Sequence, residues 1–397
     1  MKDVALDPQV CVVGGGMVGL TFALLCAEKG IATALIEARP MPEGPVELSA
    51  RVSALNLGSL SLLKELKVWP LPDERHSGVF RSLNIWDGVT GADILFDSAE
   101  VGEPHLGYNV SNAALVQALW QRAQQHPNLR LLAPMKIKRL LPLENGKVTA
   151  ELDNGELLQP DCLVGADGAE SWLRQQAGIE CDKTPYDHHA VVTVVETEKP
   201  HKEQGWQVFL PSGPLALLPL HDRYQSAVVW SMPPEQAAHL AALSDTDVAV
   251  KMNEVFGPRL GAITLKLPVK SIPLFRRHAT TYSKPGIALI GDAAHTIHPL
   301  AGQGANLGLR DAAALADLMG EAFARGRHLG HERLLARYER QRRADNRLMM
   351  EAMQFFHDSF AQTAGSWTQL RKMGMRGFNR SRALKRLCMQ YAMGGAD

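Results

Sequence analysis

Residues 291–308 of this chain read Gly291-Asp-Ala-Ala-His-Thr-Ile-His-Pro-Leu-Ala-Gly-Gln-Gly-Ala-Asn-Leu-Gly308. The apolar run 287–290 before them is typical of a buried strand, so the glycine and the aspartate stand where that strand ends. A proline-containing loop follows, and further glycines open a helix that continues through 312–318. This order places a carboxylate beside a helix N-terminus, which suits a sugar hydroxyl and a negatively charged group.

A second nucleotide-binding pattern lies near the N-terminus. Gly14-x-Gly16-x-x-Gly19 follows an apolar strand and opens a helix, and Glu37 ends the next strand. The glycines permit a tight turn, the close approach of a pyrophosphate and close helix–strand packing, while the acid accepts hydrogen bonds from a ribose. This motif predicts a dinucleotide site without separating NAD from FAD, and Glu37 argues against a 2′-phosphate there.

A third segment, Asp167-Gly168-x-x-Ser171-x-x-Arg174, follows a short apolar strand. By itself it is typical of a strand-end turn before a helix capped by a small polar residue. In a chain that already carries a dinucleotide motif, a second acid-glycine corner indicates that both corners serve one cofactor.

The segments between these corners differ in kind. Residues 80–96 and 190–230 alternate β-branched and aromatic side chains and contain turn signals, which favours antiparallel sheet. The interleaving predicts an α/β fold with a Rossmann-like cofactor domain, an inserted antiparallel-sheet substrate domain and a C-terminal helical segment. We expect a discontinuous cofactor domain over 1–75, 105–180 and 271–345, a substrate domain over 76–104 and 181–270, and a C-terminal helical region over 346–397.

Composition narrows the classes of function. Lys plus Arg and Asp plus Glu number 42 each, so the formal net charge is zero and no nucleic-acid partner is expected. The five cysteines are scattered, and the histidines form no ligand pattern with acids or cysteines, so we expect no disulfide framework and no metal site. The cysteine usage, with no long apolar run, favours a cytoplasmic location.

Positive charge is concentrated near the C-terminus. Residues 371–386 hold seven Lys or Arg residues and no acid, interleaved with apolar side chains such as Met373 and Leu384. One interpretation is a solvated surface helix. The other is contact with an anionic membrane surface or a partner protein, which would give a peripheral position at the inner membrane.

Taken together, the three corners resemble the signature of single-component FAD-dependent aromatic hydroxylases, which have the para-hydroxybenzoate hydroxylase fold. Within that group, the segments Arg51-Val-Ser-Ala-Leu-Asn, Gly165-Ala-Asp-Gly-Ala and 291–308 are closely similar to the ubiquinone-biosynthesis hydroxylases. The similarity extends over nearly the whole chain, including Leu217-Leu-Pro-Leu220 and Tyr338-Glu-Arg-Gln-Arg-Arg. The cofactor domain is therefore expected to be an FAD-binding domain.

The resemblance also implies a role for each matched residue. The ADP half of FAD would be held by Gly14, Gly16, Gly19 and Glu37. Arg51 would lie near the phosphate side of the flavin, and Asp167 behind the pyrophosphate, where it would also serve NAD(P)H. Gly291 and Asp292 would face the ribityl chain, and the isoalloxazine would be lined by Pro299, Gly302, Gln303, Gly304 and Asn306. A helix N-terminus at that place would stabilise the negative charge of reduced flavin.

One position departs from the family pattern. Many relatives carry an arginine where this chain has Asn112, so no adenine-side contact is assigned there, and Gln117 is a weaker candidate. His295 and His298 flank the flavin loop, and the ordinary interpretation is that they are hydrogen-bonded loop histidines. No catalytic residue is assigned.

The function implied by the resemblance is ring hydroxylation of a polyprenylated phenol or quinol in ubiquinone biosynthesis. NAD(P)H would be the reductant, O2 the co-substrate and a C4a-hydroperoxyflavin the oxygen donor. Residues 343–346 and Phe355-Phe356 favour the step on a 3-methyl-6-methoxy-1,4-benzoquinol. Two alternatives stay open: an FAD-dependent prenyl or quinone reductase of the same fold, and a flavin-binding scaffold subunit of a ubiquinone-biosynthesis protein complex.

Overall fold

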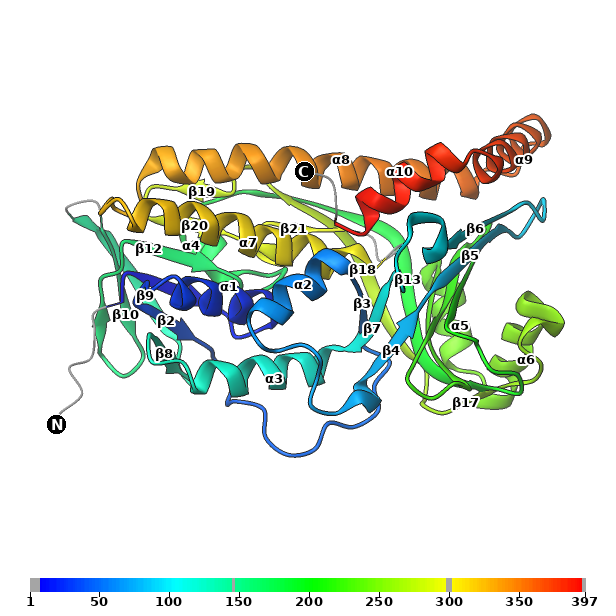
Figure 1. Ribbon diagram of the computed structural model, residues 1–397, viewed down its shortest axis with the longest axis horizontal. Coiled ribbons are helices and arrows are strands. Elements are labelled where there is room, and N and C mark those ends of the chain that lie inside the picture. The colour runs from blue at the N-terminus through cyan, green and yellow to red at the C-terminus, as the bar shows by residue number, and fades with distance from the viewer. Residues whose placement is uncertain (1–7, 145–146, 298–301, 395–397) are drawn as a thin grey trace.

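A six-stranded sheet forms the centre of one half of the molecule (Figure 1). The computed structural model describes residues 8–144, 147–297 and 302–394. The strands of this sheet are parallel except for β19, which runs antiparallel to β20. In spatial order they are β19 (Ser283–Lys284), β20 (Ile287–Leu289), β12 (Cys162–Gly165), β1 (Val10–Val13), β2 (Thr33–Ile36) and β8 (Leu129–Leu132).

Both faces of this sheet are buried, which explains its nearly continuous apolar strands. On β1, Val10 and Val12 pack in a core shared with α1 (Met17–Glu28), α3 (Asn112–Gln124) and α7 (Gln303–Phe323). The alternate residues Cys11 and Val13 pack instead in a core with the small sheet on the opposite face. That sheet consists of β9 (Ile137–Glu144), β10 (Lys147–Leu152) and β11 (Leu157–Leu158), and the short helix α4 (Trp172–Gln176) lies beside it.

A nine-stranded sheet forms the other half of the molecule (Figure 1). Its order is β21 (His295–Thr296), β18 (Lys270–Ala279), β13 (Cys181–Thr197), β16 (Gln225–Met232), β15 (Gly213–Pro219), β14 (Gln204–Leu210), β5 (Ser82–Asp87) and β6 (Asp93–Asp97), with β17 (Ile263–Leu265) paired to β13. Helices α5 (Pro234–Ala241) and α6 (Asp245–Phe256) contribute to its core.

The two sheets confirm the predicted fold class. One detail was not anticipated: in the described part of the nine-stranded sheet, β14 and β5 run parallel while the other paired strands are antiparallel. The β5–β6 hairpin comes from an earlier part of the chain and joins the sheet beside β14. No short hairpin turn connects β5 to β14, so the two strands need not be antiparallel.

A small three-stranded sheet lies between the two halves. It contains β3 (Val52–Asn56), β7 (Gly107–Ser111) and β4 (Ser77–Phe80), and α2 (Leu57–Glu65) follows β3 directly. The described residues also include the 3₁₀ turns η1 (Glu74–His76), η2 (Ser98–Val101), η3 (Gly257–Arg259) and η4 (Gly291–Ala293). The predicted domain boundaries stay a prediction, and the one at 345/346 falls within the helix that follows α7.

Three helices follow α7 and agree with the predicted C-terminal helical segment. They are α8 (Glu332–Ala361), which runs along the top of the view, α9 (Gly365–Arg380) and α10 (Arg382–Ala392) (Figure 1). Within the described ranges, no helix combines the length and the apolarity needed to cross a bilayer.

A buried ion pair fastens these helices to the substrate half. The Arg371 guanidinium donates to both carboxylate oxygens of Asp87, at 2.8 and 3.2 Å, and to the backbone oxygens of Ser359 and Gln362. Burial alone would raise the pKa of Asp87, but hydrogen bonds from Arg371, Thr90 and the Val89 amide hold it below its usual value. The pair therefore joins α9, the end of α8 and the end of β5.

Replacing Arg371 with methionine should destabilise the fold strongly. The substitution keeps most of the side-chain volume but leaves Asp87 as an uncompensated buried charge, which costs roughly 3–5 kcal/mol. Urea denaturation of Arg371→Met, compared with the exposed Arg376→Met on the same helix, measures the difference. The control should change the free energy of unfolding by less than about 0.5 kcal/mol. Equal effects from the two variants would contradict the anchoring role.

Candidate active site

Three strand ends lie side by side at one edge of the six-stranded sheet. Strand β12 pairs with β1 on one side and with β20 on the other, so the segments that follow these strands are neighbours. Backbone hydrogen bonds continue past the strands, from Ala166 N to Val13 O at 2.8 Å and from Ile290 N to Gly165 O at 2.9 Å. The carboxyl ends of parallel strands are where such sheets bind nucleotides. We call these segments the glycine corner (14–19), the Asp167 corner (166–168) and the Asp292 corner (291–293).

The three glycines of the first corner have different tasks. Gly14 has a φ of +109°, and a Cβ there would lie 2.5 Å from the backbone oxygen of Ala166. A Cβ at Gly19 would lie 2.0 Å from Gly14 O. Gly16 is exposed, and a Cβ there would meet nothing within 4 Å. Gly14 and Gly19 therefore allow the close packing of the corner, and Gly16 leaves an open surface at the start of the helix.

The open space at Gly16 lies at the start of α1. Gly16 is the N-cap of this helix, no side chain caps it, and its first turn contains no acid. Its first amide N–H groups are therefore available to an external acceptor. Free N–H groups beside a side-chain-free surface fit the pyrophosphate of FAD.

Glu37 closes the glycine corner. Its two carboxylate oxygens accept hydrogen bonds from Gly15 N at 2.7 Å and from Arg39 N at 2.9 Å. Each oxygen can accept a second bond, so the carboxylate can still bind a ribose hydroxyl. Gly15 must lack a side chain because a Cβ there would lie 2.5 Å from the ring of Trp120 in α3.

Asn112, to which no adenine contact was assigned, and Gln117, the weaker candidate, both have protein partners. Asn112 Oδ1 accepts a hydrogen bond from Ser53 Oγ at 2.7 Å, and Gln117 Nε2 donates to Gly44 O at 2.7 Å. Each side chain therefore joins α3 to a neighbouring segment. Arg51 is exposed, and its backbone oxygen accepts from Asn112 N at the start of the same helix.

The Asp167 corner is held by its own carboxylate. Asp167 accepts hydrogen bonds from Ser171 Oγ and from Leu173 N, the latter at 3.0 Å, while Ser171 caps α4 through Arg174 N. The helix-capped turn that the sequence suggested is therefore present. Each carboxylate oxygen of Asp167 accepts one of these bonds, so the side chain holds the start of α4 against the corner.

Arg174 joins this corner to the next one. The buried guanidinium donates to Ala293 O in the Asp292 corner at 2.8 Å and to Ala169 O at 2.9 Å. One side chain thus connects two acid-bearing corners that lie far apart in the sequence, at positions 167 and 292. This contact brings together the second and third predicted motifs.

Asp292 presents its carboxylate to the open side of the site. The residue is exposed, yet the protein atoms packed around it raise the pKa of its carboxyl, against the opposing charges of His295 and Arg277. Among the described residues, its side chain has no hydrogen-bond partner. A solvent-accessible carboxylate without a protein partner suits a sugar or ribityl hydroxyl. Gly291 beside it has a φ of +59° and packs against Val18 of α1.

A buried polar network lies directly behind the Asp292 corner. Asp311 of α7 is fully buried and accepts hydrogen bonds from Gly291 N at 3.1 Å, Arg342 Nε at 2.8 Å and Asn346 Nδ2 at 3.2 Å. His295 Nε2 lies 2.5 Å from the same carboxylate. Burial alone would raise the pKa of Asp311, but His295 and Arg342 hold it below its usual value.

The network continues into the substrate sheet. Tyr282 stacks near the His295 ring, at 5.9 Å between centroids, and its hydroxyl lies 3.0 Å from His278 Nε2 on β18. The backbones are joined as well, because His295 and Thr296 form β21, which pairs with His278 and Arg277. The Asp292 corner is therefore continuous with the sheet of the substrate half.

The start of α7 carries the remaining predicted residues. Gly302 is its N-cap with a φ of +61°, no side chain caps the helix, and a Cβ at Gly304 would meet only Ile297, at 4.0 Å. Gln303 is partly buried in the first turn. Pro299 and His298 lie outside the described residues. The uncapped N-terminus offers amide N–H groups to an anionic ring.

Asn306 does not present its side chain to the open side. It is fully buried, accepts hydrogen bonds from Asn56 N at 3.1 Å and Ser59 Oγ at 2.8 Å, and donates to Ala54 O at 2.8 Å. The amide therefore clamps α7 to β3 and α2. Its predicted place against the isoalloxazine stays a prediction.

Sequence patterns did not identify Asp311 or Arg342. The sequence did carry a sign of Asp311, because this acid interrupts a row of apolar residues at helical spacing. The row is Leu307, Asp311, Leu315 and Leu318, and all four are buried on one side of α7. A lone acid on an apolar stripe needs a partner in the core. Nothing in the sequence names Arg342 as that partner. Among the described residues, no cluster of three or more His, Cys, Asp or Glu could hold a metal ion.

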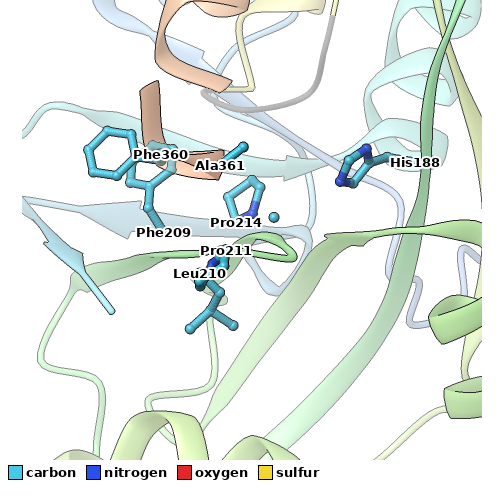
Figure 2. Close-up of a pocket in the computed structure, with 8 residues that line it drawn as sticks. His188, Phe209, Leu210, Pro211, Pro214, Phe360 and Ala361 are labelled. Atoms are coloured by element: carbon cyan, nitrogen blue, oxygen red, sulfur yellow. The ribbon is translucent and has the colours of Figure 1, made fainter. Parts of the chain in front are cut away.

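A separate apolar recess lies on the substrate half. Figure 2 shows it between the β14–β15 turn and the end of α8, where the rings of Phe209 and Phe360 stack at 4.0 Å between centroids. Its other lining residues are His188, Leu210, Pro211, Gly213, Pro214 and Ala361. It shares no residue with the three corners, so it is distinct from the candidate flavin site.

Two glycines of the motif, Gly14 and Gly16, allow a matched test. Gly16→Ala should leave the stability of the apoprotein unchanged but weaken FAD binding by about tenfold or more, because the methyl group would fill the pyrophosphate space. Gly14→Ala should instead lower the melting temperature, since the added Cβ would clash with backbone. Flavin titration and thermal unfolding of both apoproteins separate the two effects. Wild-type FAD affinity in Gly16→Ala would contradict the assignment.

Known proteins of this kind agree with the geometry. The family model described as "FAD binding domain" matches residues 7–353. The chain is 38% identical to the 3-demethoxyubiquinol 3-hydroxylase of Escherichia coli over 388 residues, covering 97% of this chain and 98% of that protein. It is 35% identical to the ubiquinone hydroxylase UbiL of Rhodospirillum rubrum, over 97% of this chain and 89% of that protein.

Solved structures show the same fold. The crystal structure of pqsL, a probable FAD-dependent monooxygenase from Pseudomonas aeruginosa, superimposes with a TM-score of 0.80 at 21% identity, covering 93% of this chain and 99% of that one. The resemblance seen in the sequence is thereby confirmed, with FAD as the cofactor. This chain belongs to the family of FAD-dependent aromatic-ring hydroxylases of ubiquinone biosynthesis.

Proposed function

We propose that this enzyme hydroxylates the ring of a polyprenylated quinol at the 3-demethoxyubiquinol step, with NAD(P)H as the reductant and O2 as the co-substrate. The 38% identity to the Escherichia coli 3-demethoxyubiquinol 3-hydroxylase over 98% of that protein supports this step over the others in the pathway. The observation that carries the chemistry is the exposed Asp292 carboxylate beside the uncapped N-terminus of α7.

The bound FAD supplies the oxygen-activating chemistry, and the chain supplies binding and orientation. Gly16 and the start of α1 would hold the pyrophosphate, Glu37 would hold the ribose and Asp292 would hold the ribityl chain. The free N–H groups at the start of α7 stabilise negative charge on the isoalloxazine.

The quinol ring is oriented by the substrate sheet. Because β21 pairs with β18, a ring bound against this sheet is positioned by the same backbone that positions the Asp292 corner. No general base is assigned, since an electron-rich ring needs orientation and exclusion of water more than proton transfer. The single glycine motif supports transient access of NAD(P)H to the flavin without a second dinucleotide domain.

The substrate tail suggests two kinds of partner. A polyprenyl chain is insoluble in water, so the enzyme must take its substrate from a membrane surface or from a protein of a ubiquinone-biosynthesis complex. The exposed basic residues within 371–386 support a peripheral position at the inner membrane.

Complementation tests the proposed step. The chain is expressed in an Escherichia coli strain that lacks its own 3-demethoxyubiquinol 3-hydroxylase, and quinones are measured by mass spectrometry. The demethoxy intermediate should disappear and ubiquinone should return, while Asp292→Ala, produced at the same level, should leave the intermediate in place.

The purified enzyme gives the second measurement. Consumption of NADH or NADPH should be coupled to hydroxylated product in the wild type. Persistence of the intermediate despite FAD-loaded protein would reject the step, and reductant consumption without hydroxylated product would favour a reductase.

A further inference from the structure

Helices α9 and α10 bury one side and leave the other side without a partner among the described residues. Both pack against the β5–β6 hairpin, and α10 also packs against η2, as their buried residues show. Met375 of α9 lies in a core with Phe209 and Phe360, and Met389 of α10 lies in a core with Leu106. Because the two helices rest on the same part of the substrate half, their free sides face away from it.

Two of the seven basic residues hold the helices in place. Arg371 pairs with Asp87, and Lys385 donates to Leu95 O at 2.9 Å and pairs with Glu100 at 2.6 Å. Both are buried. Asn379 and Phe378 add contacts to β6, through Leu95 N and the Phe96 ring. The seven residues therefore do not act as one cluster.

The exposed sides of α9 and α10 carry large apolar side chains. Spacings of three and four residues align Leu370 with Met373 on α9, and Leu384, Leu387 and Tyr391 on α10. Met373 is 70% exposed and Leu387 65%, and all five are among the exposed large apolar residues. Isolated exposed leucines are ordinary, but five on two adjoining helices form a surface that favours contact.

On α9, Arg376 and Arg380 follow Met373 by three and seven residues and so share its exposed side, and α10 adds two further exposed arginines. Arg376, Arg380, Arg382 and Arg386 are exposed, and within the described part of the chain none of them forms an ion pair. Elsewhere, exposed arginines do pair, as Arg81 does with Glu203. The sequence from 359 to 396 contains no Asp or Glu at all, although the whole chain has zero net charge.

We propose that this surface, formed by the five apolar residues and the four arginines and here called the C-terminal face, docks on an anionic lipid membrane. The inference rests on the proposed function, because it names the source of the prenylated quinol. Helices that lie in a bilayer interface combine an apolar side with basic residues, and anionic headgroups attract those residues. The absence of acids over 38 positions, 359–396, favours a uniformly anionic surface.

Docking by this face would also bring the substrate half to the lipid. Met375, Phe209 and Phe360 share one apolar core, so the helices on the membrane are fastened to strands of the nine-stranded sheet. A quinol leaving the bilayer would then enter beside the sheet that orients its ring.

Vesicle co-sedimentation of the FAD-loaded full chain tests the proposal. The probes are phosphatidylcholine vesicles with and without phosphatidylglycerol. The protein should bind only the anionic vesicles, and binding should weaken as salt rises, because screening shortens the reach of the arginines. Arg376→Glu/Arg380→Glu should reduce binding roughly tenfold or more, and Leu384→Ser/Leu387→Ser should reduce it as well.

The matched control is Arg325→Glu/Arg327→Glu. These exposed arginines lie in the α7–α8 connection, at the opposite end of the molecule (Figure 1), and should leave binding unchanged. Flavin absorbance and circular dichroism check that each variant is folded. Equal binding to neutral vesicles, no binding to anionic vesicles, or equal loss in the control would overturn the proposal. So would a dimer that forms through the face and disappears in the variants.

Turnover separates this proposal from the proposed function. The face variants should hydroxylate a prenyl-free quinol in solution as the wild type does, but lose activity on long-chain quinol in anionic vesicles. A wild type that binds vesicles without hydroxylating any quinol supports the face and rejects the step. A wild type that hydroxylates both substrates equally without binding vesicles supports the hydroxylation step and rejects membrane docking by the C-terminal face.

Discussion

The buried carboxylate of Asp311 is the contact on which the candidate site depends. A charge at zero exposure is costly unless it is paired and fully hydrogen-bonded, and Asp311 has four polar partners. Those partners come from the Asp292 corner, from β21 and from α8. One residue of α7 therefore sets where the Asp292 corner and β21 lie relative to α7 and α8.

This arrangement links the Asp292 corner to the nine-stranded sheet through backbone. The segment after Asp292 becomes β21, the edge of the nine-stranded sheet, and Arg174 joins the Asp292 and Asp167 corners. A hydroxylase must hold a ring against an activated flavin and keep water away, and a single continuous surface does this more rigidly than two hinged domains would. The Arg371–Asp87 pair extends the same surface to the C-terminal helices.

Much of the fold could be predicted from local sequence, because a glycine-rich turn after an apolar strand and an acid at a strand end are each compatible with few structures. The glycine corner, the Asp167 turn and the uncapped start of α7 all follow from such local constraints. The contacts that join them could not be predicted. Arg371 and Asp87 are separated by 284 positions, and Asn306 and Asn56 by 250, so no local pattern relates them. The parallel pairing of β14 with β5 could not be predicted either, because the two strands lie far apart in the sequence.

An equilibrium FAD titration of apoprotein Asp311→Asn measures most directly whether the buried carboxylate supports the flavin site. The substitution keeps the shape of the side chain but removes the charge that His295 and Arg342 require. The wild type should bind one FAD per chain. The variant should retain its circular dichroism and bind FAD about tenfold or more weakly, because the Asp292 corner loses its support. Wild-type FAD affinity in a folded Asp311→Asn protein would contradict this role of Asp311.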